Sequence, residues 1–174
     1  MKDGQHYTVY NFDRATRTTS VDKYSYKTSK KVATLVNSAD MDGLKYFQGY
    51  SFNNDESKIL LSTDVQPIYR HSTLAKYYVY DVASKSLEEV DNSEIQEPMF
   101  SPDSKRVAYV KERNLHIKVL GEEDPMEITQ DGGDNTIING VTDWVYEEEF
   151  AFVRAFDWNK DCLLYTSDAA DDTC

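Results

Sequence analysis

The chain has 174 residues, of which 40% are hydrophobic, a proportion sufficient for a core of ordinary domain size. Its 31 acidic and 19 basic residues give a formal net charge of −12, so we expect no nucleic-acid partner and a preference for cationic ligands. No run approaches the ~18 apolar residues of a membrane span, and the first residues contain no apolar signal region.

Short alternating runs of polar and apolar residues predict β-strands in the N-terminal part. We expect strands at residues 7–12, 21–26 and 31–36, with turn residues between them. They resemble the incomplete first unit of a repeat. Because this half-formed unit follows Met1 directly, we expect the chain to be a fragment of a longer protein.

Two fuller sets of strands follow, each with four members. The first set is predicted at residues 47–52, 58–63, 76–82 and 87–90, and the second at residues 97–100, 106–111, 115–120 and 126–129. Residues 51–61 align with residues 99–109: an aromatic residue ends one strand, a turn containing Asp reverses the chain, and an apolar strand follows. A third copy begins at residue 156, where Trp158 occupies the core position of Phe52 and Phe100.

Repeats of about 40–50 residues with four short strands each are typical of β-propeller blades. A sandwich or barrel also contains many short strands, but it is not expected to repeat one turn sequence at this period. We therefore predict an all-β fold: a partial β-propeller of about three four-stranded antiparallel blades, with one short helix.

The helix is predicted at residues 142–150. Thr142 or Asp143 is a suitable N-cap, and the glutamates that follow would lie in the first turns, where the helix dipole favours negative charge. Phe150 is spaced to turn inward with Tyr146, and we expect Trp144 to pack the helix as well.

Three consecutive carboxylates in this helix predict a cationic partner, because close like charges repel one another unless they are compensated. Successive helical residues point about 100° apart, so Glu148 and Glu149 could reach one target from two sides while Glu147 points elsewhere. A primary ammonium suits such a pair, since it has three donors and a full charge. The alternative is that the acidic stretch is a solvated face.

The run Asp143-Trp144-Val145-Tyr146-Glu147-Glu148-Glu149 resembles the motif of the dipeptidyl peptidase IV family. These serine exopeptidases remove dipeptides from peptide N-termini, usually after Pro or Ala. The resemblance implies that Glu148 and Glu149 hold the free α-amino group of a peptide substrate, with Glu147 and Tyr146 in supporting positions.

Arg70 lies in the segment that interrupts the predicted strands 58–63 and 76–82. Taken alone, a surface Arg beside a His is usually a solvated side chain. In the family that the chain resembles, an Arg-His-Ser in this place supplies a guanidinium to a substrate carbonyl, and Arg70-His71-Ser72 matches it. The resemblance therefore implies that a buried Arg70 guanidinium binds substrate, with His71 in support.

Catalytic residues are not expected in this chain. It contains no Gly-x-Ser-x-Gly elbow, and none of His6, His71 and His116 has a credible partner set for a Ser-His-Asp triad. The resemblance implies that these residues belong to a C-terminal α/β-hydrolase domain that is absent here, so the fragment alone should be inactive. A tripeptidyl peptidase of the same family, or a non-catalytic propeller that binds proteins, remains an alternative.

Metal and cofactor sites are not predicted either. The loop at residues 131–135 contains oxygen ligands and glycines but lacks the spacing and terminal Glu of a calcium loop. The two cysteines, Cys162 and Cys174, support neither a disulfide nor a zinc site.

The repeat pattern ends abruptly after residue 161. We expect residues 1–161 to be the partial propeller and residues 162–174 to be a non-native tail, since they resemble the translation of a sequencing adapter. For the full-length protein, the resemblance implies a homodimer in the periplasm or at the cell surface.

Overall fold

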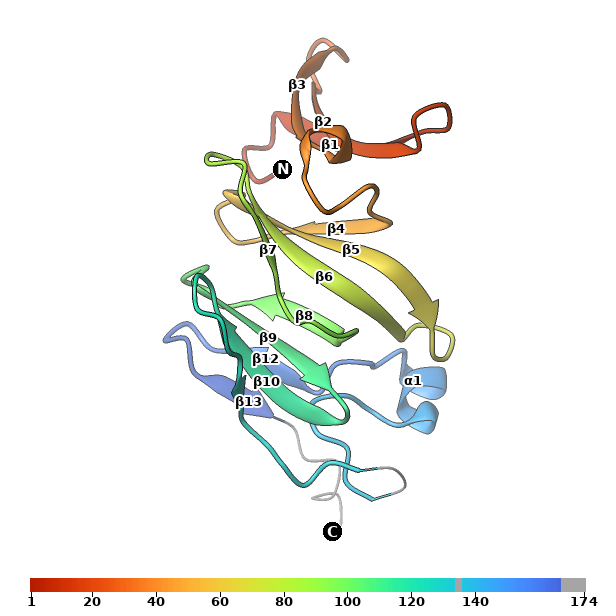
Figure 1. Cartoon of the computed structure of the whole chain (residues 1–174), viewed down its shortest axis with the longest axis vertical. Coiled ribbons are helices and arrows are strands. Elements are labelled where there is room, and N and C mark those ends of the chain that lie inside the picture. Colours follow the sequence, from red (N-terminus) through yellow and green to blue (C-terminus); the bar gives the residue numbers. More distant parts are fainter. Residues whose placement is uncertain (134–135, 167–174) are drawn as a thin grey trace. The chain divides into compact units, whose positions relative to one another are not determined.

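The structure is a computed structural model that describes residues 1–133 and 136–166. Its described part is built mainly from strands, with one short α-helix, α1 (Trp144–Phe150), and one turn of 3-10 helix, η1 (Ser38–Asp40) (Figure 1). None of its helices has the length and apolar character needed to cross a membrane. The strands are β1 (His6–Asp13), β2 (Thr18–Ser25), β3 (Lys31–Asn37), β4 (Gly49–Phe52), β5 (Lys58–Pro67), β6 (Thr73–Asp81), β7 (Leu87–Glu89), β8 (Gln96–Phe100), β9 (Arg106–Lys111), β10 (Asn114–Val119), β11 (Met126–Glu127), β12 (Phe156–Trp158) and β13 (Leu164–Thr166).

The strands form four sheets, in which neighbours in the chain are neighbours in the sheet. The orders are β1-β2-β3, β4-β5-β6-β7, β8-β9-β10-β11 and β12-β13. Two sheets thus have the four strands expected of a propeller blade, and the registers that define their pairings are antiparallel. This arrangement confirms the predicted fold class, and β12 and β13 are the described strands that have no range predicted from the sequence.

The chain divides into two compact units, and each has its own core. One unit contains residues 1–64 and 78–87, and the other contains residues 65–77 and 88–174. Alternate residues of a strand share a face, so Ile59 and Leu61 of β5 enter the first core together. The first core consists of Val21, Val36, Leu44, Phe47, Ile59, Leu61 and Tyr80; the second contains Ala108, Val110, Leu115, Phe156 and Trp158.

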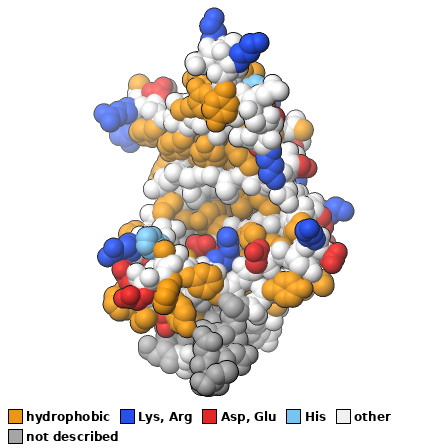
Figure 2. All heavy atoms as spheres, turned by 180° about the vertical axis from the view of Figure 1, so that it is seen from behind, with side chains coloured by type: hydrophobic (Ala, Val, Ile, Leu, Met, Phe, Trp, Pro, Cys, Tyr) orange, Lys and Arg blue, Asp and Glu red, His pale blue; other side chains and the backbone are white. Residues whose placement is uncertain are grey.

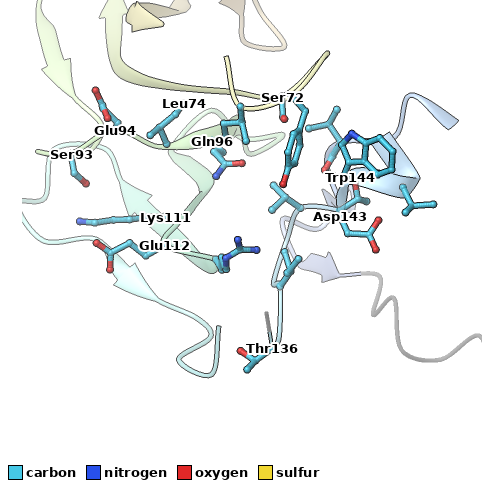
Figure 3. A pocket seen from close by; sticks show the side chains of 18 residues that line it. Ser72, Leu74, Ser93, Glu94, Gln96, Lys111, Glu112, Thr136, Asp143 and Trp144 are labelled. Carbon is cyan, nitrogen blue, oxygen red and sulfur yellow. Dashed lines mark hydrogen bonds between the residues drawn. The ribbon is translucent and has the colours of Figure 1, made fainter. Parts of the chain in front are cut away.

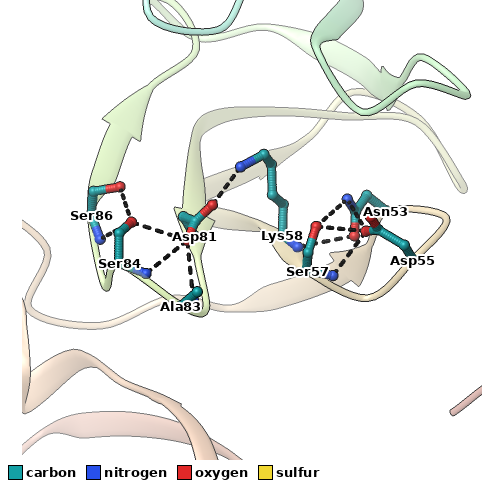
Figure 4. A network of polar contacts seen from close by, with 8 residues as sticks. All are labelled: Asn53, Asp55, Ser57, Lys58, Asp81, Ala83, Ser84 and Ser86. Carbon is teal, nitrogen blue, oxygen red and sulfur yellow. Dashed lines mark hydrogen bonds and ion pairs between the residues drawn. The ribbon is translucent and has the colours of Figure 1, made fainter.

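The turn between β4 and β5 shows why the repeated sequence folds as it does. Asp55 accepts hydrogen bonds from the Ser57 amide at 3.0 Å and the Asn53 side chain at 2.8 Å (Figure 4). The Asn53 side chain in turn accepts from the Lys58 amide at 3.0 Å, and Glu56 adopts a positive φ of 60°. Lys58 then pairs with Asp81 of β6, which ties the turn to the neighbouring strand.

The second copy of the turn repeats this pattern with different residues. Ser101 takes the place of Asn53: its hydroxyl donates to Asp103 at 2.5 Å and accepts from the Arg106 amide at 3.0 Å. Ser104 has a φ of 60°, as Glu56 does. The polar turn is therefore a structural unit, which agrees with its repetition in the sequence.

The third copy is one residue tighter. Cys162 has a φ of 59°, close to the 60° of the equivalent residues in the other copies. The Asn159 amide donates to the carbonyl of Leu163, four residues later, whereas the equivalent Asn53 amide donates to the carbonyl of Lys58, five residues later. Trp158 is 8% exposed, which confirms its predicted core position. Residues 167–174 of the predicted non-native tail lie outside the described residues, so the boundary at residue 161 stays a prediction.

Some apolar side chains belong to neither core. Figure 2 shows hydrophobic side chains gathered in patches on the face that it presents. In the first unit, Phe12 is 51% exposed and lines a hollow of about 330 Å³ together with Tyr10 and Tyr46.

Candidate functional site

Main-chain contacts on both sides of α1 hold the helix in place. The Thr142 amide donates to the Val153 carbonyl at 2.9 Å, and the Ala155 amide donates to the Gly140 carbonyl at 2.9 Å. Gly140 has a φ of 78°, and a Cβ there would lie 2.7 Å from Val110 Cγ2 in the second core. The two segments that flank the helix are thus paired with each other and anchored to packed residues.

The helix begins and ends with clear caps. Asp143 accepts a hydrogen bond from the Tyr146 amide at 3.0 Å, which confirms it as the N-cap. Ala151 adopts a left-handed conformation and donates to the Glu147 carbonyl at 3.0 Å. Only Glu147 lies in the first turn. The prediction that all three glutamates lie where the dipole favours them is therefore wrong, because Glu148 and Glu149 lie near the C-terminal end of seven residues.

Trp144 and Phe150 of the helix point outward, contrary to the prediction, whereas Tyr146 is half-buried. Phe150 is 71% exposed and Trp144 is 55% exposed, while the Tyr146 and Phe150 rings contact each other with centroids 5.8 Å apart. The only buried residue of α1 is Glu147. The side of α1 that carries Glu147 is therefore the side that faces the rest of the protein.

Glu147 is held by the tip of the β5–β6 hairpin. Its carboxylate oxygen Oε1 accepts from the His71 amide at 2.6 Å and the Ser72 amide at 2.9 Å, and the residue is only 1% exposed. Burial raises the pKa of this carboxyl, but the donors at Ser72 and His71 outweigh it and hold the pKa below its ordinary value. Glu147 is therefore a buried carboxylate of the second unit, whose oxygen Oε1 is paired with two main-chain amides.

Arg70 lies on the same hairpin tip and pairs with the helix from outside. Its Nε atom is 3.1 Å from Oε2 of Glu148, whose side chain is 20% exposed. The Arg70 side chain is 69% exposed, so the expectation of a buried guanidinium is wrong. Glu149 is exposed, and within the part of the chain that the structure describes it has no ion-pair partner. The structure thus pairs Arg70 with Glu148 and joins His71 to Glu147, whereas Glu149 and Tyr146 lie near this contact only as neighbours of those glutamates in the helix.

Glu97 and Arg154 belong to the same neighbourhood, although no sequence motif indicated them. Arg154 Nη1 lies 3.8 Å from Glu97 Oε2, and the guanidinium lies over the Phe156 ring at 5.8 Å. Burial raises the pKa of Glu97; the charge of Arg154 opposes this and the charge of Glu147 adds to it. The one available signal was a charged residue inside an otherwise apolar strand.

A cavity of about 720 Å³ lies beside the start of α1. Figure 3 shows Lys111 and Glu112 on one side of it and Asp143 and Trp144 on the other, with Ser72 of the hairpin tip at its edge. Its lining combines both signs of charge with apolar side chains, so it indicates no single class of ligand.

The described residues include no group of three or more His, Cys, Asp or Glu side chains that could hold a metal ion. Asp134 and Asn135 of the weighed calcium loop lie outside those residues. Of the histidines, His6 lies 2.6 Å from Asp3, and the His116 ring stacks on Tyr109.

Comparisons of the sequence with known proteins indicate one family. Residues 53–167 match the family model of the dipeptidyl peptidase IV (DPP IV) N-terminal region. Probable dipeptidyl-aminopeptidase B of Chaetomium globosum is 28% identical over 166 residues, which cover 91% of this chain and 18% of that protein. The corresponding protein of Aspergillus fumigatus is 38% identical over 108 residues, 60% of this chain and 12% of that protein.

Solved structures give the same result. The crystal structure of Porphyromonas gingivalis dipeptidyl peptidase 4 has a TM-score of 0.83 and 37% identity, and the match covers 94% of this chain and 24% of that one. TolB from Acinetobacter baumannii, with a TM-score of 0.51 and 12% identity, is similar in fold alone. The chain spans less than a fifth of the length of these curated relatives. With about two thirds of its residues inside the family match, the chain belongs to the dipeptidyl peptidase IV N-terminal region family.

Proposed function

We propose that this chain is the substrate-recognition part of a dipeptidyl peptidase IV-like serine exopeptidase. Glu148 and Glu149 bind the free N-terminal ammonium of a peptide, and Arg70 binds a carbonyl near that end. The serine nucleophile and its partners belong to a hydrolase domain outside these residues, so the chain alone has no peptidase activity.

The observation that carries the proposal is the charge at the end of α1. Glu148 and Glu149 occupy the last turn, where the partial negative charge of the helix end disfavours carboxylates. Arg70 supplies one positive charge, next to Glu148, and Glu149 faces solvent. A second cation with several donors fits this arrangement, and a peptide ammonium has three donors and a full charge.

The same carboxylates would exclude longer or blocked peptides. A substrate whose chain continues past this point, or whose amine is acetylated, would cover the carboxylates without providing a cation. Leaving such a charged partner unpaired costs about 1–3 kcal/mol or more. The site would therefore measure the distance from the free N-terminus to the cleaved bond, and so set the length of the released piece.

The test uses the complete protein that carries this chain. Chromogenic amides of the form Xaa-Pro are assayed with a free and with an acetylated N-terminus, and the released product is identified by mass. We expect kcat/KM for the free amine to exceed that for the acetylated form by at least about tenfold, since 1.4 kcal/mol corresponds to a factor of ten. The product mass separates release of dipeptides from release of tripeptides.

Variants then connect this preference to the site. Glu149→Gln should lower kcat/KM for the free amine about tenfold or more and leave the acetylated substrate unaffected. Glu122→Gln, at an exposed position, is the matched control. Equal turnover of free and blocked substrates by the wild-type protein would refute the proposal.

A further inference from the structure

We infer that Glu147 is a positioning residue, whose buried carboxylate fixes the hairpin tip to α1 and so sets the separation between Arg70 and the Glu148–Glu149 pair. This inference rests on the proposed function, because it concerns the geometry of that same site. It assigns Glu147 no contact with substrate.

The covalent arrangement makes the link direct. His71, whose amide donates to Glu147 at 2.6 Å, follows Arg70 in the chain, and Glu148 follows Glu147. The buried hydrogen bonds and the exposed ion pair therefore join neighbouring positions of the same two segments. Any shift of the tip relative to the helix would change the distance from Arg70 Nε to Glu148 Oε2, which is 3.1 Å.

The two links differ in strength. The Arg70–Glu148 pair has one partner 69% exposed, and exposed ion pairs hold geometry weakly. Hydrogen bonds from main-chain amides to an ionised carboxylate are stronger, and burial shields these from water. A peptide ammonium bound at Glu148 would compete with Arg70, whereas the hydrogen bonds at Glu147 would persist.

Glu147 acts from behind the site. The residue is only 1% exposed, and its oxygen Oε1 accepts hydrogen bonds from two main-chain amides, so it faces the hairpin tip and not solvent. It is also the only buried residue of α1, so it is the one fully buried side chain that joins the helix to the hairpin tip.

Two substitutions separate positioning from a direct effect of charge. Glu147→Asp keeps the negative charge but is one methylene shorter, so it draws the hairpin tip out of place or loses its hydrogen bonds. Glu147→Gln keeps the length and an acceptor oxygen but loses the charge. If Glu147 positions the site, Glu147→Asp lowers kcat/KM for free-amine substrates at least as much as Glu147→Gln, by about tenfold or more.

Hydrogen exchange supplies a readout that does not depend on turnover. In the complete protein, the amides of His71 and Ser72 should exchange about tenfold or more faster in Glu147→Asp than in the wild type. Hydrolysis of a small uncharged ester, which needs no N-terminal anchor, should remain at the wild-type rate in both variants. Glu122→Gln again serves as the matched control.

The outcomes distinguish this inference from the proposed function. If Glu147→Asp behaves like the wild type while Glu147→Gln is impaired, Glu147 acts through its charge and the inference is overturned. If both variants also lose ester hydrolysis, the carboxylate supports the fold as a whole, and the inference fails as well. The proposed function fails separately, when the wild-type protein does not distinguish free from acetylated substrates.

Discussion

Arg70 and Glu148, one on a hairpin tip and one on a helix, place a guanidinium nitrogen 3.1 Å from a carboxylate oxygen. Because the Arg70 side chain is 69% exposed, this pair contributes little to stability. We expect Arg70→Ala to change the free energy of unfolding by less than about 0.5 kcal/mol and to lower kcat/KM for Xaa-Pro substrates about tenfold or more.

Steady-state kinetics and thermal unfolding of the complete protein check both parts of this prediction, with the exposed Arg14→Ala as control. An increase in kcat/KM in Arg70→Ala would contradict the role proposed for Arg70. If Arg70 only neutralises Glu148, its removal would free that carboxylate and tighten binding of the ammonium.

Asp91 should make the second unit sensitive to acid. Its carboxylate accepts from Tyr109 Oη at 2.6 Å and Lys111 Nζ at 2.9 Å, and the residue is 6% exposed. Burial raises the pKa of Asp91, but the hydrogen bonds from Tyr109, Ser93 and Lys111 lower it further, to about 2. Because the pKa of Asp91 is lower in the folded than in the unfolded state, its carboxylate stabilises the fold at pH values above the unfolded-state pKa. This stabilisation is lost as the pH falls through the folded-state pKa.

The window for this loss therefore runs from about pH 4 down to about pH 2, and its size is on the order of 2 kcal/mol. Denaturant unfolding at a series of pH values measures it. Asp91→Asn should flatten the dependence in that window, whereas Asp124→Asn, at an exposed carboxylate, should not. An unchanged slope in Asp91→Asn would contradict the assignment.

Gly140 is predicted to tolerate no side chain. Its φ of 78° disfavours other residues, and an added Cβ would lie 2.7 Å from Val110 Cγ2 and 3.2 Å from Leu115 Cδ1. Gly121 has a similar φ of 87° with nothing within 4 Å, so Gly121→Ala measures the backbone cost alone. Gly140→Ala should lower the free energy of unfolding by about 1–3 kcal/mol more than Gly121→Ala does, owing to overpacking. Equal losses of unfolding free energy in the two variants would show that Val110 and Leu115 move to make room for the added methyl group.

The repeated turns offer a stabilising change. Ser104 has a φ of 60°, a conformation that costs roughly 1 kcal/mol for a residue with a Cβ. Ser104→Gly should therefore raise the midpoint of thermal unfolding. The neighbouring Lys105 is not among the residues with positive φ, so Lys105→Gly should lower the midpoint or leave it unchanged. A lower midpoint in Ser104→Gly would show that its side chain contributes more than the strain removes.

The sequence was sufficient for the strands because their signal is local. The apolar run after the repeated turn predicted β9 at residues 106–111 without error, and the repeat of one polar turn separated blades from other all-β folds. Residue type and place narrowed the helix cap to Thr142 or Asp143, and the structure shows that it is Asp143. These features depend on a few residues close together in the chain.

Orientation could not be predicted in the same way. Helical spacing placed Tyr146 and Phe150 on one side of α1, but which side faces the protein depends on Glu147, whose partners are distant in sequence. No pattern indicated that a carboxylate would be the buried residue, because burial of a charge depends on donors that only the fold brings near it. The exposure of Arg70 has the same origin. The hairpin tip contacts α1 through the main-chain amides of His71 and Ser72, so the Arg70 side chain stays outside this contact.

Many helices finish with Lys or Arg in their last turn, whereas α1 finishes with two carboxylates. The cations that stabilise its end must therefore come from outside the helix. Arg70 provides one of them, from the hairpin. In the function we propose, a bound peptide provides the other, so substrate would act as a capping group and ligand binding would also tighten the last turn of α1.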